Sequence, residues 1–216
     1  MPRRRWHLGR WFIVLMVGTL GWVGWTAYAY RSAISQAKAL GWYVQHTDPV
    51  ERIWKNWKSA FEKETWLDGV TLLSIPTSQQ VEQHLDIVHR LDPRGLQIYD
   101  ASTLRDLSAF IPLKRLKAVR VLNATGLTNV DELKNLPSLQ KVGLSGCTGL
   151  TNVDVLKSLP ALQRVGLTGC TGLTNVDALK NLTALKVVWV DGCTGLTVES
   201  VKALKAALPN TQIFGP

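Results

Sequence analysis

The sequence predicts an α/β solenoid, a chain wound into stacked coils with a parallel sheet on its concave face. A transmembrane helix and a short helical spacer are expected to precede it. Three observations predict this plan: a 23-residue repeat in the second half, an uncharged stretch near the N-terminus, and helical periodicity between the two. Of the 216 residues 46% are hydrophobic and 19% charged, which is enough apolar material for one packed domain plus extensions.

The N-terminal stretch predicts a membrane anchor. Residues 11–30 carry no charge, and at ~1.5 Å per residue a helix of that length spans the ~30 Å hydrocarbon core of a bilayer. The residues 1–10 before it form a basic tail with Arg3, Arg4, Arg5 and Arg10. The positive-inside rule then places this tail in the cytoplasm, and everything after Arg31 on the external or periplasmic side of the plasma membrane.

A cleaved signal peptide is the alternative interpretation of the same stretch. It has a basic start, an apolar run, and Ala27-Tyr28-Ala29 in the small-x-small pattern that precedes a cleavage site. Cleavage after Ala29 would release a secreted protein that begins at Tyr30. The length of the apolar run and its bulky aromatics favour the uncleaved anchor, and both interpretations export the C-terminal part.

Residues 31–65 are expected to form a helical spacer. A first helix continues out of the membrane and stops at Gly41, and Asp48-Pro49 provides a capping residue and a first helical position for a second. Trp54 and Trp57 lie on the apolar face of that second helix, either packed on the following domain or facing a membrane or partner.

Residues 66–95 are expected to form an N-terminal cap or a degenerate first repeat. Leu73 and Ile75 lie one period upstream of the repeated apolar pairs and therefore predict a strand. Residues 81–91 are expected to form a helix beneath it.

The repeat covers residues 96–216. The sequence Thr-Gly-Leu-Thr-Asn-Val-Asp begins at Thr125 and recurs at Thr148 and Thr171, with a partial copy at Thr194. An alternating apolar pair opens each unit at the same spacing: Leu96/Ile98, Val119/Val121, Val142/Leu144, Val165/Leu167 and Val188/Val190. Each pair predicts a short strand that bonds to the same positions one repeat away, with strands ~4.8 Å apart.

The apolar positions of one unit identify a resemblance. They are Leu139, Val142, Leu144, Cys147, Leu150, Val153, Leu156 and Leu159. This pattern resembles the leucine-rich repeat, in the cysteine-containing, ribonuclease-inhibitor-like classes but with a shorter unit. The plan of one membrane helix, a spacer and a small repeat domain also resembles a family of bacterial membrane-anchored proteins. The resemblance implies a curved solenoid with a parallel sheet on its concave side, and it implies no particular ligand.

Several repeated polar and small residues are interpreted as structural. Asp131, Asp154 and Asp177 are expected to cap the return segments, and Gly149 and Gly172 to supply tight turns. The cysteines form one column, Cys147, Cys170 and Cys193, in line with Ala124 and Ala101 in earlier repeats. Because neighbouring thiols in such a column are ~5 Å apart on parallel vectors, we expect three buried, unpaired thiols and no disulfide.

The sequence contains no pattern typical of an active site. His84 and His89 are five residues apart, which is not a metal-ligand spacing, and nucleophile and phosphate-binding motifs are absent. We therefore expect neither catalysis nor a cofactor nor a metal. The formal net charge of +9 divides into +4 in residues 1–30, 0 in 31–95 and +5 in 96–216. Without a basic patch interleaved with aromatics, nucleic acid is not an expected partner.

The outward side chains of the strands are the candidate binding surface. Three columns cross the strands there, and the residues chosen from them are Gln97, Tyr99, Arg120, Lys141, Gly143, Arg164, Gly166, Trp189 and Asp191. Two adjacent glycines flanked by Arg120 and Trp189, and edged by Lys141 and Arg164, predict a shallow trough with a cationic rim and one aromatic wall.

These observations together predict a non-enzymatic binding module, displayed outside the plasma membrane by a single-pass anchor formed by residues 11–30. The expected partner is a protein or peptide, and a glycan with negative charge also suits the trough. A secreted effector or adhesin-like binder is the first alternative, and an envelope enzyme is a second for which the sequence nominates no residue.

Overall fold

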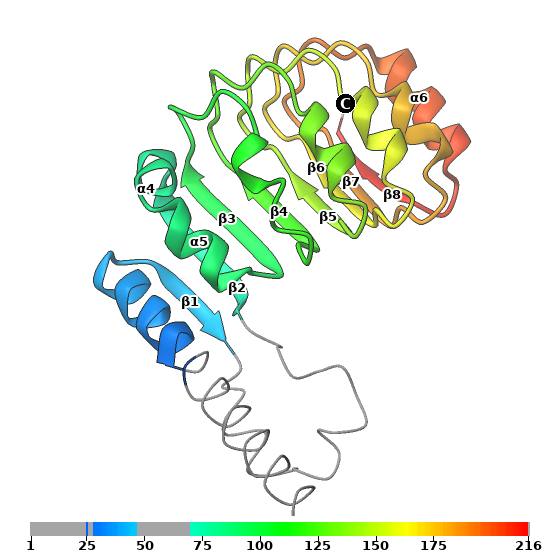
Figure 1. The fold of residues 1–216 in the computed structure, drawn as a ribbon. Coiled ribbons are helices and arrows are strands. Elements are labelled where there is room, and N and C mark those ends of the chain that lie inside the picture. The colour runs from blue at the N-terminus through cyan, green and yellow to red at the C-terminus, as the bar shows by residue number, and fades with distance from the viewer. Residues whose placement is uncertain (1–24, 26–27, 47–69, 216) are drawn as a thin grey trace, which may run out of the picture.

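The computed structural model describes Trp25, residues 28–46 and residues 70–215, and its strands form one eight-stranded sheet in chain order (Figure 1). The strands are β1 (Tyr43–His46), β2 (Val70–Thr77), β3 (Gly95–Asp100), β4 (Ala118–Val121), β5 (Lys141–Gly143), β6 (Arg164–Gly166), β7 (Val187–Trp189) and β8 (Gln212–Phe214). Strands β2 to β8 run parallel, as the repeat predicts, and β1 pairs antiparallel with β2.

The sheet register follows the sequence period. Val119 lies opposite Val142, Val142 opposite Val165, and Val165 opposite Val188. The same step runs upstream, where Leu73 and Ile75 of β2 lie opposite Leu96 and Ile98 of β3. The degenerate first strand therefore continues the register of the repeats.

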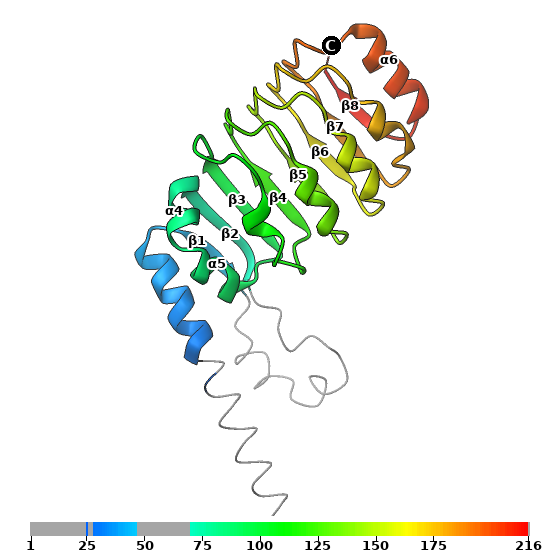
Figure 2. The same cartoon turned by 45° about the horizontal axis from the view of Figure 1, so that its top comes forward.

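The return segments lie on one side of the sheet, as the views in Figures 1 and 2 agree. They contain α4 (Ser78–Gln83), α5 (Leu85–Leu91), the 3-10 helices η1 (Ser108–Phe110), η2 (Asp131–Asn135), η3 (Asp154–Ser158) and η4 (Asp177–Asn181), and α6 (Val198–Ala207). The opposite side, which we call the open face, carries no helix in the described residues. It is the surface on which the sequence places the candidate site.

The core is a set of apolar columns between the sheet and the return segments. In one coil Val142, Leu144, Leu150, Leu156 and Leu162 are 0–2% exposed, and the equivalent positions of neighbouring coils are buried in the same way. Each fully buried leucine or valine contributes ~1.5–3 kcal/mol, and it does so only when a neighbouring coil covers it.

In η2, η3 and η4 an asparagine side chain, not that of the aspartate two residues later, accepts the hydrogen bond at the start of the helix. Asp131 and Asp177 were expected to cap with their side chains, but each is the first helical residue and donates its backbone N–H instead. The acceptors are Asn129 Oδ1 and Asn175 Oδ1, at 2.7 Å in both cases. Asp154 and Asn152 form the same Asx turn at 3.3 Å. The aspartates keep a favourable position in the first turn, where the helix dipole is positive.

The two classes of repeated glycine also have different roles from those expected. The tight turns are at Gly146 and Gly169, whose φ angles are 74° and 75°, whereas Gly149 and Gly172 have no positive φ. A Cβ at Gly149 would lie 2.8 Å from the carbonyl oxygen of Thr125, and one at Gly172 would overlap that of Thr148. These glycines are needed because one coil passes directly over the backbone of the coil before it.

The N-terminal unit differs from a purely helical spacer. A helix covers residues 28–39, the turn at Gly41 has φ 76°, and residues 43–46 form β1 on the edge of the sheet. Ala33, Ala37 and Trp42 join the common core at 0–3% exposure. The helix is also hydrogen bonded to the cap, since Arg90 donates to Gln36 (3.2 Å) and Gln80 to the Leu40 carbonyl (3.4 Å). The described part of the spacer thus packs on the repeat domain and shares its core.

Two predictions of the sequence fall largely or wholly outside the described residues. They are the anchor at 11–30, of which only Trp25 and residues 28–30 are described, and the amphipathic helix with Trp54 and Trp57. Within the described residues, no helix combines the length and apolar character that crossing a bilayer requires.

The close approach of successive coils predicts a difference between two glycines of one repeat. Gly172→Ala should lower the free energy of unfolding by about 1–3 kcal/mol, because its methyl group meets the Thr148 carbonyl and the backbone has to shift. Gly166→Ala is the control, since its methyl group would have no heavy atom closer than 3.7 Å. Urea unfolding followed by circular dichroism measures both, and equal losses for the two variants would disprove the close-approach argument.

Candidate functional site

The open face presents the side chains that alternate with the buried strand residues. Its central column consists of Gln97, Arg120, Gly143, Gly166 and Trp189, each paired with the next across adjacent strands. Where the two glycines follow each other, the backbone of β5 and β6 is left uncovered. Glycine weakens a strand interior and often marks a place where a ligand or another chain approaches the backbone closely.

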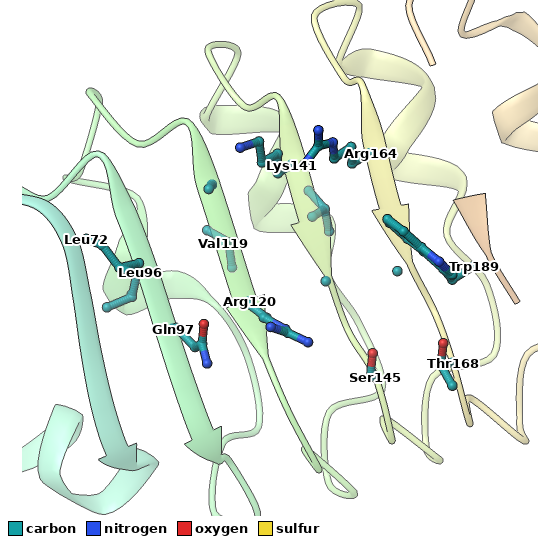
Figure 3. A pocket seen from close by; sticks show the side chains of 14 residues that line it. Leu72, Leu96, Gln97, Val119, Arg120, Lys141, Ser145, Arg164, Thr168 and Trp189 are labelled. Carbon is teal, nitrogen blue, oxygen red and sulfur yellow. The ribbon is translucent and has the colours of Figure 1, made fainter. Parts of the chain in front are cut away.

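A hollow of about 460 Å³ lies over these glycines (Figure 3). Seven of the nine residues chosen from the sequence line it: Gln97, Arg120, Lys141, Gly143, Arg164, Gly166 and Trp189. Tyr99 and Asp191 do not line it, although both are exposed. Seven further residues complete the lining: Leu72, Leu96, Ala118, Val119, Val142, Ser145 and Thr168.

Trp189 forms the aromatic wall and is held from behind. Its ring stacks on Phe214 of β8, with centroids 6.1 Å apart and planes 12° apart. On the other side, a Cβ at Gly166 would lie 4.0 Å from Trp189 Cε3, so the indole borders the glycine floor directly. Because Phe214 occupies one ring face, the stack fixes the indole as a wall for a ligand rather than leaving it free to rotate.

Three cations surround the floor, and no carboxylate lines it. Lys141 and Arg164 lie opposite each other on β5 and β6, at one edge of the hollow, and Arg120 lies on β4 (Figure 3). The stem of Arg120 leans over its neighbour, since a Cβ at Gly143 would be 3.1 Å from Arg120 Cγ. None of the three forms an ion pair with another described residue. The hollow is therefore a concentration of positive charge that the described protein does not neutralise.

The opposite edge of the hollow is polar and uncharged. Ser145 and Thr168 lie there, one repeat apart, and Figure 3 shows their hydroxyls pointing in the same direction. A hydroxyl both donates and accepts, so this edge can bind backbone amides or carbonyls of a ligand. The arrangement supplies recognition groups of three kinds, which are cationic, aromatic and hydroxyl.

The pairing of the strands that form this site identifies the fold. Identical positions pair strand by strand in a parallel sheet, with one strand and one return segment per 23 residues. The chain has the leucine-rich-repeat fold.

Solved structures with this fold are similar to the chain. The leucine-rich-repeat domain of the type III effector XopL matches 56% of the chain at 26% identity with a TM-score of 0.43. The internalin InlF of Listeria monocytogenes matches 74% at 16% identity (TM-score 0.42), and a leucine-rich-repeat protein of Leptospira interrogans matches 59% at 17% identity (TM-score 0.42). The chain spans 40%, 54% and 38% of those three chains. No protein-family model and no curated protein matches the sequence.

The histidines of the leucine-rich-repeat cap have structural contacts. His84 packs edge-on against Trp42, with ring centroids 6.0 Å apart, and His89 Nε2 lies 2.9 Å from the Ala109 carbonyl oxygen. Among the residues that the structure describes, no three or more His, Cys, Asp or Glu side chains gather as metal ligands would. These contacts account for the two histidines as packing residues.

The cysteine column is buried in the core, away from the open face. In the structure the three thiols are unpaired and buried, each at most 1% exposed. Cys170 Sγ donates to the Leu144 carbonyl and Cys193 Sγ to that of Leu167, both at 2.9 Å. Burial raises the pKa of the Cys193 thiol to about 11, which opposes formation of the reactive thiolate.

The burial of the column, together with the raised pKa of Cys193, predicts how the thiols react. At pH 8 the Cys193 thiol, with that pKa, is ionised in about one molecule in a thousand. Burial blocks access of the reagent to all three thiols, so native protein should react with Ellman's reagent negligibly within minutes. In urea all three cysteines should react. The absorbance at 412 nm follows the reaction, and a cysteine of the native protein that reacts as fast as free cysteine would contradict the buried column.

Proposed function

We propose that the chain is a non-enzymatic binding module whose open face binds a protein or peptide partner that carries negative charge. The observation that carries this proposal is the hollow over Gly143 and Gly166, with its unneutralised cations and its fixed aromatic wall. Solenoid repeats commonly bind partners through such an extended surface of parallel strands. An acidic partner would exchange its water contacts for charge-assisted hydrogen bonds, which are roughly twice as strong as neutral ones.

The geometry favours binding over catalysis. The lining residues include a lysine and two arginines but no histidine, cysteine or carboxylate, so the hollow lacks a side chain that could act as a general base near neutral pH. Its floor is backbone and its walls are a stacked indole and an arginine stem. Such a surface can hold and orient a ligand without transforming it.

The module is proposed to be held at the outer side of the plasma membrane by residues 11–30. The uncharged stretch and the four arginines before it support this proposal. The helix of residues 28–39 follows directly and is hydrogen bonded to the cap, so an anchor would connect to the repeats without a flexible tether. Release after Ala29 remains the alternative, and it would leave Tyr30 as the first residue.

Fractionation separates the two forms. We expect the intact 24.0 kDa chain in the membrane pool of expressing cells, since an uncleaved helix of that hydrophobicity stays in the bilayer. Intact-mass spectrometry of the membrane and soluble pools makes the measurement. A soluble exported species that begins at Tyr30 would replace the anchor with a released binder.

Photo-cross-linking tests the open face in living cells. A photoreactive amino acid in place of Thr168, which lines the hollow, should give a discrete adduct. The same amino acid in place of Thr151, which is also exposed but outside the hollow, should not. Arg164→Glu should reduce the Thr168 adduct by at least about tenfold, because it places a like charge opposite the acidic partner.

Lys157→Glu is the matched control for Arg164→Glu. Lys157 lies on η3, in the return segment that precedes β6, and it is exposed. Its replacement with Glu changes the net charge by the same amount. The Thr168 adduct should survive this change. An adduct of equal yield from positions 151 and 168, or one indifferent to Arg164→Glu, would remove the open face as the binding surface.

A further inference from the structure

We propose that the ligand of the hollow is an extended peptide segment of about six residues that crosses the strands. One acidic side chain of this peptide lies over Gly143 and Gly166. The apolar or aromatic side chain two residues along, which points to the same side of an extended chain, packs against Trp189. The inference rests on the proposed function and specifies the chemistry of its partner.

The length follows from the sheet. The central column of the hollow runs from Gln97 on β3 to Trp189 on β7, across four strand intervals. At ~4.8 Å per interval the path is about 19 Å long, and an extended chain at ~3.3 Å per residue covers it with about six residues. Gln97 at one end and Ser145 and Thr168 along the side supply partners for the backbone groups of such a segment.

The charge of the segment follows from an unfavourable pair in the fold. Lys141 and Arg164 are directly opposite on adjacent strands, an arrangement of like charges that destabilises a sheet. Arg120 adds a third positive charge from the neighbouring strand, and no described residue pairs with any of the three. A carboxylate between them would relieve the repulsion and accept hydrogen bonds from all three side chains.

The position of the acidic side chain follows from the two glycines. Any larger residue at 143 or 166 would project into the space between Arg120 and Trp189, because side chains of this column point out from the open face. The glycines are not required by the backbone, since neither has a positive φ. Gly166 even has room for a Cβ at ordinary contact distances. The gap is therefore best explained as space for a side chain of the ligand.

The rest of the lining favours a peptide over an acidic polysaccharide. Leu72 and Ala118 contribute apolar surface, and Gln97 is the lone side-chain amide of the lining, which contains no carboxylate. A sugar chain carries many hydroxyls, and each that is buried without a paired donor and acceptor costs free energy. An extended peptide with an acidic and an apolar side chain two positions apart presents both on one face, and it matches both the cations and the apolar surface.

Selection from a random-hexapeptide phage library tests the inference, with the full-length chain in detergent as the target. We expect enriched hexapeptides to contain Asp or Glu two positions from Leu, Phe, Tyr or Trp, so that both side chains face the hollow. A fluorescein-labelled copy of the most enriched peptide should then bind with an affinity that falls as salt rises, and replacing its acidic residue with the amide should weaken binding at least tenfold.

Variants of the chain locate that peptide. Gly166→Leu fills the gap and Arg164→Glu reverses a rim charge, and each should weaken binding at least tenfold in fluorescence anisotropy. Thr151→Leu and Lys157→Glu make the same kinds of change on exposed positions outside the hollow and should leave the affinity unchanged. Circular dichroism of all four variants should show wild-type spectra, which separates loss of binding from loss of fold.

The outcomes distinguish this inference from the proposed function. Enrichment of basic or uncharged peptides, or no enrichment at all, overturns the inference. Binding of heparin or polygalacturonate in place of peptides, sensitive to Gly166→Leu, also overturns it but keeps the hollow as the binding site. Acidic-peptide binding that ignores both Gly166→Leu and Arg164→Glu would overturn the hollow itself and the proposed function with it.

Discussion

The structure depends on the burial of equivalent apolar side chains, one coil above the next. Leu127, Leu150 and Leu173 are 0% exposed and stand one repeat apart, and no single coil could cover any of them alone. A shift of one coil by one residue would turn its inward column toward the open face and expose several such side chains at once. The free energy of burial therefore fixes the register, and the register fixes every other position of the repeat.

This constraint explains why the polar and glycine columns are as strict as the apolar ones. With the coils in register, the turn after each strand recurs at the same height, and Gly146, Gly169 and Gly192 take left-handed φ angles of 70–75° there. Asn123 takes the same place in an earlier coil with φ 60°, since asparagine tolerates that conformation. The Asn-Asp pairs repeat for the same reason, because each 3-10 helix must begin where its neighbour begins.

The part of the fold that could be predicted from the sequence is the part that repeats. Val142 and Val165 share one position of the period, so their pairing and burial followed from spacing alone. β1 does not repeat, and its place on the sheet edge comes from the pairing of Tyr43 with Ser74, a contact between distant residues that no local pattern records. The capping role was assigned to Asp131 instead of Asn129 because both residue types cap helices, and only the backbone path separates them.

The residues of the candidate site that could be predicted from the sequence are likewise those that follow the repeat. Spacing placed Arg120, Gly143, Gly166 and Trp189 in one column, and the hollow forms there. Phe214 was missed because the last step of the sheet is 25 residues, from Trp189 to Phe214, where the earlier steps are 23. The ring behind the indole thus lies outside the period, although it determines which face of Trp189 a ligand can reach.

The residue types on the open face are less constrained by the repeat than those in the core. Burial requires the same kind of residue at each inward position, whereas the central outward column reads Gln97, Arg120, Gly143, Gly166 and Trp189 and repeats only the glycine. Solvent alone would accept threonine or lysine at every one of these positions, with better strand propensity than glycine. The inward positions of the coils thus carry the same kind of residue in every repeat. The outward column instead contains glycines that weaken the strands, and it brings like charges together. Folding stability does not account for that column, and this is why we propose that a ligand binds there.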